Sequence, residues 1–183
     1  MKSLAVLFVA VSLNVFAQQS EFDKYSAYPM TPERLAVWKQ DSIKYNHLIN
    51  SDSIEIYLLQ HFNALRKSYN LKPLSLYVND SAYIKCNQWA DYLLDNKKIG
   101  HNGDAYEIAA TMVINCNQFY AHKSNINLFL ANQLYNMWLN SPKHKLAILN
   151  PDKKFMISCS DTRFSYAAPF FNKNLVGLAR FFE

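Results

Sequence analysis

His144 is the residue whose type and position point most directly to chemistry, because it lies in the first turn of an expected helix. Ser141 is a favourable N-cap residue and Pro142 suits the first helical position, which predicts a short helix running to about Leu149. The positive end of the helix dipole opposes protonation of an imidazole in the first turn. We therefore expect a neutral ring nitrogen that is free to bind a proton or a metal ion.

The stretch from Trp138 to Asn150 resembles the tryptophan-x-asparagine-serine-proline-x-histidine signature of the CAP superfamily. This is the secreted domain of cysteine-rich secretory proteins, venom antigens and plant pathogenesis-related proteins, and the stretch looks closest to the bacterial branch. Other landmarks resemble the family's in the same order: residues 62–66 with 71–74, Gly100-His101, residues 106–109 and a last strand at 175–182. The resemblance runs from about residue 51 to the C-terminus.

The resemblance implies a site formed by His101, Glu107 and His144, because members of the family bring two histidines and two glutamates together in a central cleft. Two imidazoles and a carboxylate are suited to zinc or another divalent cation, with a position left open for water. His101 and His144 would be the metal ligands and Glu107 the candidate general base. Spacing alone would leave the two histidines unrelated, since the sequence contains no H-x-x-x-H pair.

The sequence departs from the family pattern around this site. Tyr106 and Ile108 replace the glycine and asparagine that flank the family's glutamate, which predicts a different backbone path there. The helix before Trp138 offers Gln133 and Asn136 where eukaryotic members carry the second glutamate. We therefore expect a cleft that keeps its position and differs in its chemistry.

Apolar periodicity predicts the elements that position these residues. Helices are expected at about 52–69, from Asn79 or Asp80 to about residue 98, and at 127–140. Short β-rich runs follow at 155–159, 164–170 and 175–182, with a turn at 172–174 between the last two. Helices followed by an antiparallel, hairpin-built C-terminal sheet predict an α+β fold. The resemblance implies that this fold is an α-β-α sandwich.

The N-terminus predicts an exported protein. A basic start at Lys2, an apolar run over residues 4–13 and a small-residue cleavage site ending at Ala17 are typical of a secretory signal peptide. The chain then divides into a signal peptide at 1–17, a lead-in with one helix at 18–50 and a CAP/SCP-like domain at 51–183. No later apolar run reaches the ~20 residues that a membrane helix needs, so we expect a soluble protein in the periplasm or outside the cell.

The chain has 3 cysteines, and export would place them in an oxidising compartment. Cys86 shares an expected helical face with Tyr83 and Ala90, which predicts a buried thiol. If a bridge forms, Cys116 with Cys159 is the favoured pair; the alternative is that all three stay reduced.

Three classes of function remain open. The first is a secreted, non-enzymatic binding module whose cleft holds a small molecule, a lipid or a cell-envelope component. The second is a metal-assisted hydrolase that uses the same cleft, and the third is a structural or interaction protein with a vestigial site. Binding ranks first because no nucleophile with an orienting base is evident, Ser141 being expected to be occupied as an N-cap. The net charge of +5 is spread over scattered lysines, so we expect no nucleic-acid partner.

Overall fold

A computed structural model of the chain describes residues 48–96, 106–115, 121–167 and 170–183, with single positions at 32, 33, 36, 40, 101 and 118. Within these ranges the side chains of residues 115 and 163–173 are not described. The expected signal peptide at 1–17, most of the lead-in at 18–50, and Cys116 lie outside the described residues. The elements used below are, in chain order, α3 (Ser51–Ser68), β1 (Ser75–Leu76), α4 (Asp80–Asp95), β2 (Glu107–Asn115), η2 (Lys123–Asn125), α6 (Ile126–Leu139), α7 (Pro142–Ile148), β3 (Phe155–Ala167) and β4 (Phe170–Phe182).

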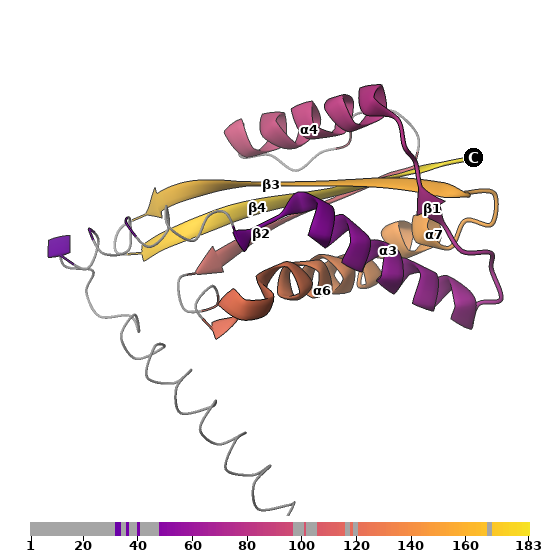
Figure 1. The fold of residues 1–183 in the computed structure, drawn as a ribbon, viewed down its shortest axis with the longest axis horizontal. Coiled ribbons are helices and arrows are strands. Elements are labelled where there is room, and N and C mark those ends of the chain that lie inside the picture. The colour runs from indigo at the N-terminus through magenta and orange to yellow at the C-terminus, as the bar shows by residue number, and fades with distance from the viewer. Residues whose placement is uncertain are drawn as a thin grey trace, which may run out of the picture.

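The strands form one mixed sheet in the order β1-β3-β4-β2. Strand β1 runs parallel to β3, whereas β4 is antiparallel to both of its neighbours. Figure 1 shows α4 on one face of this sheet, with α3, α6 and α7 on the other side. The α+β class and the α-β-α sandwich are therefore confirmed.

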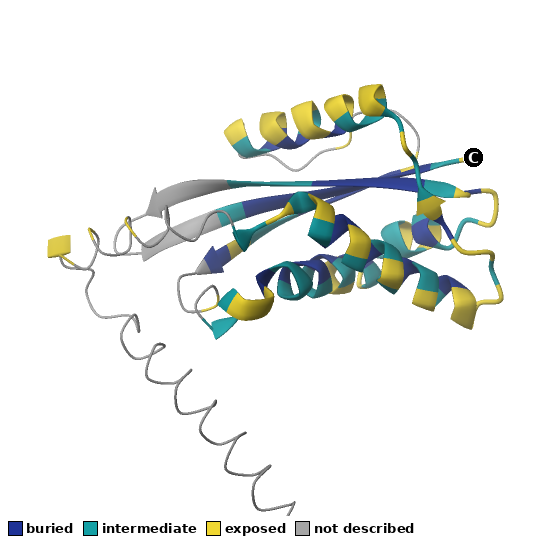
Figure 2. Cartoon of the chain, viewed as in Figure 1, coloured by how far each residue is buried: buried dark blue, intermediate teal, exposed yellow. Residues whose placement is uncertain are grey.

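Each face of the sheet has its own apolar core, because side chains alternate along a strand. Val176 and Leu178 of β4 point into the core under α4, and Ala179 and Phe181 point into the larger core on the other side. Figure 2 shows the matching pattern on α4, which is buried towards the sheet and exposed on its outer side. Helix α6 lies so close to β4 that a Cβ added at Gly177 would meet the side chain of Leu134 at 2.5 Å.

Side chains of α3 cover the edge of the sheet beyond the short β1. The backbone N–H of Ser158 donates to Glu55 Oε1 at 2.6 Å, and the N–H of Ser160 donates to Ser51 Oγ at 3.1 Å. The Tyr83 hydroxyl of α4 donates to Glu55 Oε2 at 2.8 Å. Buried backbone donors need partners, and here a carboxylate and a hydroxyl replace the missing strand.

The helix positions agree with the expectation, but the strands differ. Segment 172–174, expected to be a turn, lies inside β4, and β3 continues without a break to Ala167. Asn172 pairs with Ser165 on one side and Asn115 on the other, so the ladders on both sides override the turn preference of asparagine. Strand β2 was not predicted at all.

The favoured pairing of Cys116 with Cys159 is not formed. Cys159 is a free, buried thiol, and its neighbour is Cys86. Both sulfurs lie in the core between α4 and the sheet, where alternation along β3 directs Cys159 towards α4. The burial predicted for Cys86 is confirmed.

No helix in the described ranges is long and apolar enough to cross a membrane.

Candidate functional site

The buried guanidinium of Arg66 fixes the far end of the helix that carries His144. Its Nη1 donates to the carbonyls of Ile148 at 2.8 Å and Asn150 at 2.9 Å, where α7 ends. Its Nε and Nη2 donate to the carbonyls of Lys72 and Lys153. The last carbonyls of a helix have no partner inside the helix, so one side chain of α3 satisfies them and locates α7.

The predicted start of α7 is confirmed, with Pro142 at the first turn and Ser141 in the extended backbone of an N-cap. The expectation that Ser141 is occupied as a cap is wrong, because its side chain makes no capping hydrogen bond to the helix. The helix begins here because the ring of Pro142 already holds its backbone at the φ that a first helical turn requires.

The His144 imidazole is half-buried and disposed to stay neutral. Burial lowers its pKa below the ordinary value of 6.5, and the nearby His101 lowers it further. The direction agrees with the expectation from the sequence, and desolvation is its largest cause. Its Nδ1 is buried without a hydrogen-bond partner among the described groups.

The two histidines lie side by side although 43 positions separate them in the sequence. The ring centroids of His101 and His144 are 5.9 Å apart, and the rings meet edge to face at 74°. The His101 side chain is 51% exposed, so this ring is the part of the pair that solvent reaches.

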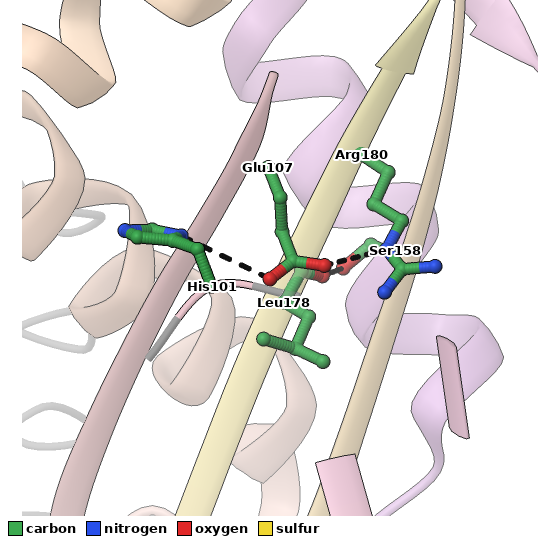
Figure 3. A network of polar contacts seen from close by, with 5 residues as sticks. All are labelled: His101, Glu107, Ser158, Leu178 and Arg180. Atoms are coloured by element: carbon green, nitrogen blue, oxygen red, sulfur yellow. Dashed lines mark hydrogen bonds and ion pairs between the residues drawn. The ribbon is translucent and has the colours of Figure 1, made fainter. Parts of the chain in front are cut away.

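Glu107 lies beside this pair at the start of β2, with its side chain almost completely buried. Its Oε1 is 3.8 Å from His101 Nδ1, and its Oε2 accepts a 2.6 Å hydrogen bond from Arg180 Nε. Figure 3 shows the carboxylate between the imidazole of His101 and the guanidinium of Arg180. Arg180 stands opposite Glu107 on β4, so the register of two neighbouring strands forms this ion pair. A buried carboxylate needs such a partner.

Sequence reasoning missed Arg180. The signal was present, since a single arginine interrupts the apolar run Leu175–Phe182, and a charge within a buried strand is rarely without a partner. Its Nη2 is also buried, with no hydrogen-bond partner in the described part of the chain.

Tyr106 occupies the position of the family's glycine and adopts a backbone that glycine prefers. Its φ is 45°, in the left-handed region that side chains disfavour. The Lys153 ammonium lies 4.2 Å from the centre of the Tyr106 ring, a cation–π contact that holds the ring in place. The tyrosine thus occupies a left-handed conformation, and the expected difference in backbone path from the family stays a prediction.

The metal site expected at His101 and His144, with Glu107 as general base, stays a prediction. Across the described ranges, no group of three or more His, Cys, Asp or Glu side chains is placed to hold a metal ion. Glu107 would have to leave Arg180 before its Oε2 could coordinate a cation. Gln133 and Asn136, at the place of the second glutamate, supply amides, which are weak zinc ligands.

The remaining described histidines stack against aromatic side chains. His61 stacks on Tyr135 at 5.0 Å between centroids, and His122 stacks on Phe129 at 3.9 Å. These contacts give both rings a packing role, whereas His101 and His144 contact each other.

Comparison with known families and structures adds one clear match. The family model described as CAP, the cysteine-rich secretory protein family, matches residues 59–156. A search of curated protein sequences finds no match. Among solved structures, the chain is similar to the CAP domain of Enterococcal PrgA, with 16% identity and a TM-score of 0.34. That alignment covers 69% of this chain and 59% of the PrgA chain.

Proposed function

Because this chain belongs to the cysteine-rich secretory protein family, we propose that it is an exported binding module whose ligand contacts His101, His144 and Glu107. The ligand is a small molecule, a lipid or a cell-envelope component that carries a polar head group.

The unpaired Nδ1 of His144 carries the proposal. A buried polar atom without a partner costs about 1–3 kcal/mol, and native proteins keep few of them. A ligand atom that hydrogen-bonds there would remove that cost. The adjoining His101 ring is open to solvent and gives the ligand a way to reach the pair.

The chemistry of the pair favours a hydroxyl or a protonated acid on the ligand. A neutral imidazole offers one donor and one acceptor nitrogen, and a hydroxyl can satisfy either. The ion pair with Arg180 compensates the charge of Glu107, so the site does not require a cationic ligand. Glu107 acts here by holding His101 in place, at 3.8 Å from its Nδ1.

Two defined probes test the proposal: oleate and a soluble peptidoglycan fragment. Each is titrated into protein with isotope-labelled histidines while the imidazole resonances are followed by NMR. We expect one probe to shift the His101 and His144 resonances saturably, and His144→Ala to weaken binding at least about tenfold, the loss of roughly one good hydrogen bond.

His122→Gln is the matched control, since it alters another half-buried imidazole that stacks on Phe129. Binding should survive this change. Saturable binding that leaves both His101 and His144 resonances unmoved would reject the site, and failure of both probes to bind would reject these ligand classes.

The proposed export has its own test, which is N-terminal sequencing of protein recovered outside the cytoplasm. Cleavage after Ala17 predicts a mature chain that begins near Gln18. Recovery of a chain that begins at Met1 would contradict this.

A further inference from the structure

Cys86 and Cys159 form a dithiol inside the core between α4 and the sheet. Cys86 is 0% and Cys159 1% exposed, and both side chains belong to the same buried cluster, where Cys86 is the group that acts most strongly on the Cys159 thiol. They come from a helix and a strand that are far apart in the sequence, and apolar residues surround them in one cluster, among them Ala90, Leu93 and Leu178.

We propose that Cys86 and Cys159 are joined by a disulfide when the protein folds under oxidising conditions, which fastens α4 to β3. Two thiols that already lie in one core cluster, on a helix and the strand beneath it, need little backbone movement to bring their sulfurs together. The biological occurrence of this bond rests on the export proposed above, whereas the pairing itself does not.

The oxidant required is a disulfide, either in a thiol–disulfide oxidoreductase or in oxidised glutathione. The thiolate of one cysteine attacks the oxidant's disulfide, releases one thiol and leaves a mixed disulfide on the protein. The second cysteine, as its thiolate, then attacks the protein sulfur of that mixed disulfide and releases the second thiol. Two protein thiols are thereby oxidised, and one disulfide is reduced to two thiols.

The surroundings of the pair indicate when this exchange takes place. The hydrogen bond with Cys86, followed by burial, raises the pKa of Cys159, although Arg180 acts in the opposite direction. A buried thiol of raised pKa supplies little thiolate. The bond should therefore form while α4 is still undocked, and the fully folded, reduced protein should resist oxidation.

Peptide mapping tests the pairing directly. The full chain is unfolded, reduced and refolded in a buffer of reduced and oxidised glutathione, then alkylated and cleaved with trypsin. The cysteines fall in three different peptides, 86–97, 99–123 and 155–163. We expect a linked 86–97 and 155–163 pair with peptide 99–123 alkylated. A 99–123 to 155–163 link, or alkylation of all three, would overturn the proposal.

Variants supply an independent readout. Cys116→Ser should keep the link and show a fall in unfolding temperature when a reductant is added. Cys86→Ser should lose that reductant effect. A reductant effect that persists in Cys86→Ser would contradict the proposal, and if this variant does not fold, the peptide map of the unsubstituted chain decides the question. A link found in vitro but missing from protein isolated outside the cytoplasm would count against export and not against the pairing.

Discussion

Arg180 and Glu107 stand opposite each other on β4 and β2 and are joined by a hydrogen bond of 2.6 Å from Nε to Oε2. Both side chains are buried, so each charge depends on the other for its stability in the fold. The same bond fixes the carboxylate beside His101. Because Oε2 is engaged and the charge of Glu107 is already compensated, the ion pair also competes with a metal ion for this carboxylate.

The first prediction concerns this competition. Arg180→Gln leaves Glu107 as a buried carboxylate without its cation, which should destabilise the protein by about 3–5 kcal/mol. Zinc could then bind Glu107 together with the two histidines and restore part of the loss. We expect zinc to raise the unfolding temperature of Arg180→Gln more than that of the unsubstituted protein. The effect should vanish in Arg180→Gln/His144→Ala, and equal responses with and without Arg180 would show that the ion pair does not exclude the metal.

The second prediction is a pH dependence of stability that belongs to His144. Its pKa in the fold is lowered by burial and then by His101, so the unfolded chain binds the proton more readily. Stability should therefore fall as pH drops from about 6.5 through the lowered folded pKa and change no further below it. His144→Gln removes the titrating group, and its denaturant midpoint should fall less over the same interval. Identical slopes of the denaturant midpoint against pH for the two proteins would contradict this assignment. His61→Gln, which replaces another imidazole with the same side chain, is measured as a comparison.

The helices could be predicted from the sequence, because their signals are local. Asn79 caps α4 through its side chain, as expected for asparagine before an apolar helix. Pro142 starts α7 for a similar reason. The family resemblance supplied the pairing of His101 with His144, which no spacing rule would have given.

The sheet could not be predicted in the same way, since its contacts join distant segments. Asn172 was expected in a turn and lies in a strand paired on both sides. Arg180 was overlooked because its partner, Glu107, is 73 residues away. Ladder register and buried ion pairs are properties of the assembled layers, and a window of neighbouring residues carries little information about them.

The third prediction concerns Glu55, the buried carboxylate at the edge of β3. Desolvation raises its pKa above 4.5, although hydrogen bonds from Ser158 and Tyr83 act in the opposite direction. The ionised form is thus the less favourable one in the fold, and stability from this group is lost as pH rises through the raised pKa. As the pH rises from about 4 to about 7, the unfolding free energy of Glu55→Gln should therefore increase relative to that of the unsubstituted protein. An unchanged difference over that range would contradict this assignment.

The fourth prediction compares two substitutions of Tyr106. Both Tyr106→Gly and Tyr106→Ala remove the ring that lies beneath Lys153, but only glycine relaxes the φ of 45°. A left-handed residue with a side chain costs about 1–2 kcal/mol, so the glycine variant should be the more stable of the two by roughly 1 kcal/mol. At ordinary backbone positions the order is reversed. Denaturant titration of both variants measures the difference, and a more stable alanine variant would show that the backbone is not strained here.

The last prediction links the core to the site through Arg66. Arg66→Lys replaces a planar fork that serves four carbonyls with a single ammonium that has three donors. At least one buried carbonyl loses its partner, and we expect a loss of about 2–4 kcal/mol in unfolding free energy. Because the carbonyls of Ile148 and Asn150 fix the end of α7, the helix should loosen and expose His144. The pKa of His144, followed by NMR, should then rise towards 6.5. Lys67→Ala is the control, since it changes the exposed residue next to Arg66. It should change the unfolding free energy by less than about 0.5 kcal/mol and leave the pKa of His144 unchanged. A stable Arg66→Lys protein with an unchanged His144 pKa would show that α7 is held by its other contacts.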